Sequence, residues 1–117
     1  MEITTGIDIV DIERFEMVVK RYGERFIRRI YTRRELEHLP EINSHFYMAV
    51  SFSFKEAIWK ALPDEKQKEF YFKDIEIIWK KGKPIPLLKE KEDIQGLTLN
   101  FLKRSKNIIT TAIFIQF

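Results

Sequence analysis

The chain has 117 residues, of which 44% are hydrophobic and 33% are charged, a balance typical of one globular domain and unlike a disordered chain. Cysteine is absent, which excludes disulfide scaffolds, thiolate metal sites and cysteine nucleophiles and is consistent with a reducing compartment. The opening residues lack a signal-peptide pattern, and no apolar run approaches the roughly 20 residues that cross a bilayer. We therefore expect one cytoplasmic domain over residues 1–117, without a membrane partner.

The net charge is only +3, but the basic residues are unevenly distributed. Between Lys20 and Glu37 the chain carries seven lysines and arginines against three glutamates, so the rest of the chain is close to neutral. A local cationic patch of this kind predicts an acidic partner, which could be a nucleic acid, a phosphate group or an acidic protein.

The segment from Ile3 to Val10 predicts a short buried strand that is interrupted by Gly6. Asp8 stands in this strand between two isoleucines, and a carboxylate there needs a partner. Either Asp8 or Asp11 caps the helix that follows, or Asp8 binds a metal ion.

Residues 12–30 have helical periodicity, with a break predicted at Gly23. Four arginines fall near one face of this helical segment, which is either a solvated surface or a docking surface for an acidic partner. A capping box, Thr32 to Glu35, predicts a short third helix that stops at Pro40. The four arginines are Arg14, Arg21, Arg25 and Arg28.

A long helix is predicted from Ser44 to Leu62, because apolar residues recur there every three or four positions. Glu56 and Lys60 are four residues apart on this helix and therefore project from the same side. They either form an ordinary surface ion pair or converge on one ligand.

The remainder of the chain predicts a charged connector over residues 64–69 and then four strands. Because helices precede strands, we predict an α+β fold in which an antiparallel sheet packs against the long helix. The predicted strands are Phe70 to Trp79, Ile85 to Lys89, Leu97 to Leu102, and Ile108 to Phe117.

Two motifs resemble those of the holo-acyl-carrier-protein synthases, the small phosphopantetheinyl transferases. The first is Gly6-Ile7-Asp8-Ile9-Val10 with the following Ile12-Glu13-Arg14-Phe15, and the second is Phe52-Ser53-Phe54-Lys55-Glu56-Ala57 with Lys60-Ala61 after it. The segments Gly23-Glu24-Arg25-Phe26, Asp74-Ile75-Glu76 and Gly82-Lys83-Pro84 extend the resemblance over most of the chain.

The resemblance implies an enzyme that moves 4′-phosphopantetheine from coenzyme A to a serine of an acyl carrier protein. It implies Mg²⁺ held by Asp8 and Glu56, catalytic roles for Glu56 and Lys60, and carrier binding by Arg14 and Arg21. It also implies a homotrimer. The residue types suit this chemistry, because Mg²⁺ favours one or two carboxylates together with water and substrate phosphates.

Three features depart from the family pattern. Ser51 stands where the family has an arginine, Leu62 to Glu65 carries no glycine where the family has a glycine-rich loop, and the histidine near the end of the penultimate strand is absent. An alternative is therefore a diverged homologue that binds coenzyme A or carrier without efficient turnover. A small basic domain that binds nucleic acid is a further alternative, which would require exposed aromatic residues beside the arginines.

Overall fold

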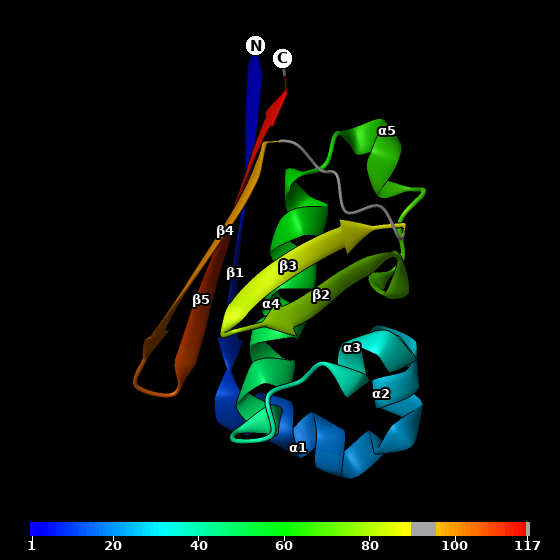
Figure 1. The fold of residues 1–117 in the computed structure, drawn as a ribbon, viewed down its shortest axis with the longest axis vertical. Coiled ribbons are helices and arrows are strands. Elements are labelled where there is room, and N and C mark those ends of the chain that lie inside the picture. The colour runs from blue at the N-terminus through cyan, green and yellow to red at the C-terminus, as the bar shows by residue number, and fades with distance from the viewer. Residues whose placement is uncertain (90–95, 117) are drawn as a thin grey trace.

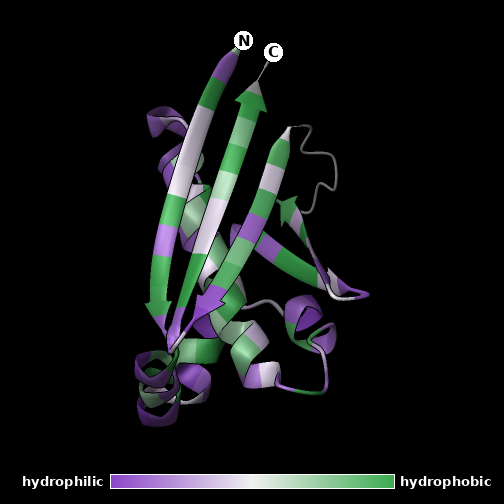
Figure 2. Cartoon of the chain, turned by 90° about the vertical axis from the view of Figure 1, so that its left-hand side faces the viewer, coloured by the Kyte–Doolittle hydropathy of each residue, from purple (hydrophilic) through white to green (hydrophobic). Residues whose placement is uncertain are grey.

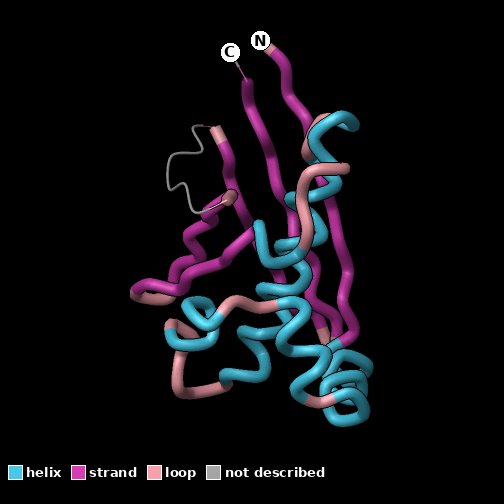
Figure 3. The backbone as a smooth tube through the Cα atoms, turned by 90° about the vertical axis from the view of Figure 1, so that its right-hand side faces the viewer, coloured by secondary structure: helices cyan, strands magenta, loops and turns pink. Residues whose placement is uncertain are grey.

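The computed structural model describes residues 1–89 and 96–116. It has an α+β fold with antiparallel sheets, as the sequence predicts. Helices α1, α2 and α3 gather at one end of the long helix α4 (Figure 3). The elements are β1 (Glu2–Asp11), α1 (Ile12–Tyr22), α2 (Glu24–Ile30), α3 (Arg33–Glu37), α4 (Ser44–Ala61), α5 (Asp64–Gln67), a 3₁₀ turn (Phe72–Asp74), β2 (Ile75–Lys80), β3 (Lys83–Leu88), β4 (Leu97–Arg104) and β5 (Asn107–Gln116).

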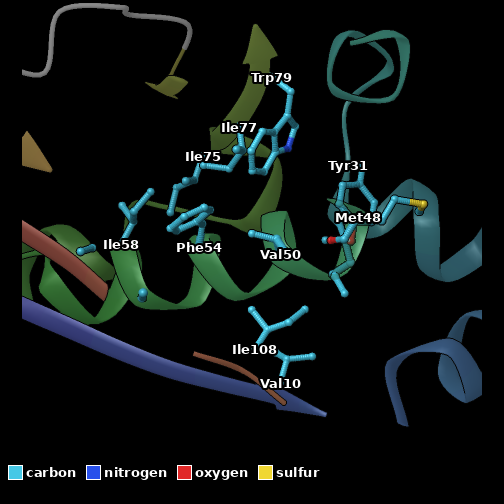
Figure 4. Close-up of a cluster of buried hydrophobic side chains, with 14 of the residues drawn as sticks. Val10, Tyr31, Met48, Val50, Phe54, Ile58, Ile75, Ile77, Trp79 and Ile108 are labelled. Atoms are coloured by element: carbon cyan, nitrogen blue, oxygen red, sulfur yellow. The ribbon is translucent and has the colours of Figure 1, made fainter. Parts of the chain in front are cut away.

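Helix α4 lies between two sheets (Figure 1). One sheet has the strand order β1-β5-β4, and the other is the β2-β3 hairpin; all pairings are antiparallel. Both sheets contribute to the core, so α4 is apolar on more than one side (Figure 4). The buried residues drawn there include Phe54 and Ile58 of α4, Val10 and Ile108 of the three-stranded sheet, and Ile75, Ile77 and Trp79 of the hairpin.

Close packing of β1 on α4 depends on Gly6. A Cβ atom at this position would collide with the main-chain carbonyl oxygen of Ala57. Next to it, the Thr4 hydroxyl donates a 2.6 Å hydrogen bond to the Ala61 carbonyl at the last turn of α4. The glycine of the first motif thus sets the distance between the strand that carries Asp8 and the helix that carries Glu56.

The predicted antiparallel strands divide into two sheets, because the β2-β3 hairpin packs on the other side of α4 (Figure 1). The strand expected from Phe70 begins only at Ile75, because Phe72–Asp74 form a 3₁₀ turn in which the Phe72 carbonyl accepts from the buried Lys55 ammonium. The connector over residues 64–69 contains α5. The expected strand end at Phe117 lies outside the described residues.

Strand β1 is not a buried strand. Its side chains alternate between α4 and the opposite face, as the period of a strand requires. On the opposite face Ile3, Ile7 and Ile9 are 56%, 57% and 64% exposed. Figure 2 views the molecule with this three-stranded sheet in front and shows hydrophobic residues recurring along its strands. No helix among the described residues has the length and apolar character needed to span a membrane.

Candidate active site

Asp8 of the first motif and Lys60 of the second are in direct contact. The Lys60 Nζ donates to Asp8 Oδ1 at 3.1 Å and to the main-chain oxygen of Ile7 at 3.0 Å. The other carboxylate oxygen, Oδ2, accepts a 2.9 Å hydrogen bond from the Ser53 hydroxyl. The helix cap that Asp8 might have formed is made by Asp11, whose side chain accepts from the Arg14 main-chain nitrogen. Asp8 is therefore available to the site.

Glu56 shares the electrostatic environment of Asp8. Burial raises the pKa of Glu56, the Asp8 charge raises it further, and the Lys60 ammonium partly offsets both effects. Repulsion between two neighbouring carboxylates is a condition that a bound cation relieves. The structure thus brings Asp8 together with Glu56 and Lys60, which follow it in the sequence by 48 and 52 residues.

A pocket with aromatic walls opens at Glu56. Its volume is about 380 Å³. The walls come from α4, the segment around α5 and the start of β2, so the pocket lies between the long helix and the chain that returns to the hairpin. The lining residues are Lys55, Glu56, Trp59, Gln67, Lys68, Phe70, Tyr71, Phe72 and Ile75.

A buried ion pair beside this pocket was not predicted from the sequence. Lys55 is 0% exposed and its ammonium donates to Glu35 Oε1 at 2.7 Å and to the main-chain oxygens of Phe72 and Ile75. The second Glu35 oxygen accepts from the Ile77 main-chain nitrogen at 3.0 Å. The pair therefore ties α3, α4 and β2 together. Its signal in the sequence was a lysine directly after the core residue at position 54.

A second acid, Glu76, extends this polar network toward the surface. It accepts from the Thr32 hydroxyl at 2.6 Å and from the guanidinium of Arg34. Burial raises the pKa of Glu76, but the hydrogen bonds from Arg34 and Thr32 and the nearby positive charges together hold it below the ordinary value. For Glu35, burial outweighs the opposing effect of Lys55, and the pKa is raised.

Arg14 and Arg21 lie exposed on α1, as a docking surface requires. Two apolar hollows adjoin the basic residues of this region. Arg14 and Val18 line one hollow of about 360 Å³, and Val18 also lines a second of about 220 Å³ together with Arg25. The combination of exposed guanidinium groups and apolar floor is suited to a protein partner.

Two departures from the family pattern have structural explanations. The Ser51 hydroxyl is buried and accepts a 2.8 Å hydrogen bond from the Trp79 indole. In place of a glycine-rich loop after α4, helix α5 is held by reciprocal hydrogen bonds between Trp59 and Gln67. Hydrogen bonds therefore tie both positions into the packing around α4.

The sequence model of the 4′-phosphopantetheinyl transferase superfamily matches residues 4–111, nearly the whole chain. The chain belongs to this superfamily. Within it, the chain is 35% identical over 97 residues to the holo-[acyl-carrier-protein] synthase of Aquifex aeolicus, covering 82% of this chain and 80% of that protein. It is 39% identical over 90 residues to the synthase of Halothermothrix orenii, covering 75% and 71% of the two chains.

Solved structures of superfamily members share the fold. The synthase of Neisseria meningitidis aligns with a TM-score of 0.76 at 25% identity, over 97% of this chain and 98% of that one. The synthase of Helicobacter pylori, solved in complex with coenzyme A, aligns with a TM-score of 0.72 at 29% identity, over 92% and 96%. The resemblance to holo-acyl-carrier-protein synthases that the motifs indicated is thus confirmed.

Proposed function

We propose that this chain transfers 4′-phosphopantetheine from coenzyme A to a serine of an apo acyl carrier protein and releases adenosine 3′,5′-bisphosphate. The observation that carries the proposal is the meeting of Asp8, Glu56 and Lys60 beside a pocket with aromatic walls. Membership of the superfamily and the similarity to holo-[acyl-carrier-protein] synthases support it.

Asp8 and Glu56 are the residues that would hold Mg²⁺. The donor set fits this ion, because Mg²⁺ takes one or two carboxylates and completes its shell with water and phosphate oxygens. Among residues 1–89 and 96–116, no three histidine or acidic side chains cluster as a metal site. Two carboxylates fill only part of the Mg²⁺ shell, so positions would remain for water and substrate oxygens. When bound, the ion would neutralise charge on the pyrophosphate of coenzyme A.

Lys60 supplies a second positive charge. Its side chain is 45% exposed, so the ammonium that contacts Asp8 can also reach an incoming phosphate. In the transfer, the carrier serine oxygen bonds to the phosphorus attached to pantetheine, and the bond from that phosphorus to the bridging oxygen of the pyrophosphate breaks. The electron pair leaves with adenosine 3′,5′-bisphosphate, and the serine proton passes to a base, for which Glu56 acting through water is one candidate.

The carrier docks on α1 through Arg14 and Arg21 in this proposal. Arginines attract an acidic protein over a distance and pair with its carboxylates in two-pronged contacts. The α1 helix follows β1 after Asp11, so a carrier seated on α1 lies close along the chain to Asp8. Phe15 and Phe26 pack against each other inside this face and are not free to stack on bases, so Tyr22, which is exposed beneath the Arg21 guanidinium, is the aromatic residue of α1 that a nucleic acid could use.

The uncovered face of the β1-β5-β4 sheet supports association between copies of the chain, and we propose that they form a homotrimer. In the register of β1 and β5, Ile9 lies opposite Ile109, and Ile3 lies opposite Ile115. The exposed isoleucines of β1 and Leu102 of β4, which is 59% exposed, therefore belong to one apolar face. Burial of such a face between copies is favourable, and it would bring residues of a neighbouring protomer toward the site. A cytoplasmic location remains a prediction.

The test is the intact mass of an apo carrier protein after incubation with this chain, coenzyme A and Mg²⁺. We expect the mass of phosphopantetheine to be added, and EDTA to prevent the addition. Asp8→Ala and Glu56→Ala should abolish transfer while the circular dichroism spectrum is retained, and Glu41→Ala serves as a control at an exposed acid. An unchanged carrier mass with several carriers, together with measurable coenzyme A binding, would instead favour the diverged homologue.

A further inference from the structure

Asp8 is held from two sides, and the partner on its buried side has no role in the function proposed above. Oδ1 faces Lys60, whereas Oδ2 accepts the 2.9 Å hydrogen bond from the Ser53 hydroxyl. The Ser53 oxygen lies 2.7 Å from the hydroxyl oxygen of Thr110. Ser53 belongs to α4 and Thr110 to β5, where Thr110 is the residue directly opposite Asp8. Both hydroxyl residues are 0% exposed.

The direction of these hydrogen bonds follows from the number of protons. An ionised carboxylate only accepts, so Ser53 donates its single proton to Asp8. Ser53 then has only lone pairs for its second contact, and Thr110 must donate to Ser53. The three groups therefore form a directed chain from Thr110 through Ser53 to Asp8.

Packing alone does not require these two hydroxyl groups to point toward Asp8. A buried serine in a helix can donate to the main-chain carbonyl one turn earlier, and valine has nearly the same shape as threonine without a hydroxyl group. Instead, both side chains are placed behind one carboxylate oxygen of a proposed metal ligand. We infer that Ser53, oriented by Thr110, is a positioning residue that fixes the Asp8 carboxylate so that Oδ1 faces the cation.

This inference rests on the proposed function, because it gives Asp8 the role of a Mg²⁺ ligand. With Ser53 in place, rotation of the carboxylate would break a buried, charge-assisted hydrogen bond. Without it, the carboxylate can turn so that Lys60 competes for both oxygens. Loss of a group that orients a metal ligand typically weakens metal affinity by about 10–100-fold.

The first test measures the binding of Mn²⁺ alone, as a spectroscopic substitute for Mg²⁺, by electron paramagnetic resonance. We expect Ser53→Ala to bind Mn²⁺ about 10-fold more weakly than the unaltered chain. Ser51→Ala is the matched control, because it removes another buried hydroxyl of the same helix whose hydrogen bond goes to Trp79. This control should lower the folding stability and leave the Mn²⁺ affinity unchanged.

A second pair of variants separates positioning from packing. Thr110→Val keeps the shape and removes the hydroxyl, whereas Thr110→Ser keeps the hydroxyl and removes a methyl group. Positioning predicts that Thr110→Val weakens Mn²⁺ binding and Thr110→Ser does not. A packing role predicts instead that Thr110→Ser is the more damaging variant. This pair also keeps the inference testable should Ser53→Ala fail to fold.

The outcomes distinguish this inference from the proposed function. If the unaltered chain binds Mn²⁺ and both Ser53→Ala and Thr110→Val bind it equally well, the positioning role is overturned while the metal site stands. If the unaltered chain binds no Mn²⁺ and transfers no phosphopantetheine, the proposed function fails and the inference fails with it. Weaker binding in both variants, with Ser51→Ala and Thr110→Ser unchanged, supports the inference.

Discussion

The buried pair of Lys55 and Glu35 allows a quantitative prediction for Lys55→Met, which keeps the length of the side chain and removes its charge. The substitution leaves the Glu35 carboxylate buried beside the Ile77 nitrogen and removes the donor to the main-chain oxygens of Phe72 and Ile75. Breaking a buried ion pair by removing one partner costs about 3–5 kcal/mol. Since the free energy of unfolding of domains of this size is only about 5–15 kcal/mol, we expect Lys55→Met to lose a large fraction of the stability.

The assay is urea unfolding at pH 7, followed by circular dichroism. Lys60→Met is the control. The Lys60 ammonium is half-exposed, so its removal should lower the free energy of unfolding by less than about 1 kcal/mol. The double variant Glu35→Gln with Lys55→Met removes the unpaired charge and should regain part of the lost stability. A Lys55→Met variant that unfolds at the same urea concentration as the unaltered chain would refute the reasoning.

The pH dependence of Lys55→Met gives a second readout. Burial already raises the pKa of Glu35, and loss of the neighbouring ammonium, which lowers it, must raise the pKa further. A group whose pKa is raised on folding contributes stability at low pH, and this contribution is lost as the pH rises through the folded-state value. Lys55→Met should therefore be less destabilised at pH 5 than at pH 8. The double variant carries a neutral glutamine in place of Glu35 and should therefore lack this pH dependence.

Three further predictions concern the scaffold. Gly6→Ala should lower stability by about 1–3 kcal/mol, measured by urea unfolding, because the new Cβ collides with Ala57. Glu76 has a lowered pKa in the folded chain, so its contribution is present above about pH 4.3 and is lost as the pH falls through the folded-state value. Glu76→Gln should therefore lose less stability than the unaltered chain between pH 5 and pH 3. Ile7→Lys should dissociate the proposed trimer in sedimentation velocity, and an unchanged sedimentation coefficient would contradict the proposed interface.

The parts of the fold that the sequence predicted are those set by local chemistry. The break at Gly23, the capping box from Thr32 to Glu35 and the extent of α4 follow from propensity and periodicity, and all three are present. The contact between Asp8 and Lys60 could be expected only through the family resemblance, because no local rule relates residues in different elements.

The errors arose where tertiary contacts override local pattern. Ile3, Ile7 and Ile9 have the composition of a buried strand, but their face is uncovered within the chain. The aromatic run from Phe70 to Phe72 resembles a strand, yet a 3₁₀ turn begins at Phe72, whose carbonyl accepts from the buried Lys55 ammonium. Neither outcome can be derived from one segment, because each depends on whether a second element packs against that segment.

Two adjacent residues of α4 therefore have separate tasks. Successive side chains of a helix are about 100° apart, so Lys55 points into the buried network while Glu56 lies at the pocket near Asp8. Lys55 fixes the rotation of the helix at this turn and also holds Phe72 and Ile75, which line the same pocket. Loss of that one ammonium would release the Phe72 and Ile75 carbonyls at the wall of the pocket and leave the Glu35 carboxylate unpaired with it. The buried contact that joins α3, α4 and β2 thus also supports the wall of the pocket, although of the two adjacent residues only Glu56 belongs to the proposed chemistry.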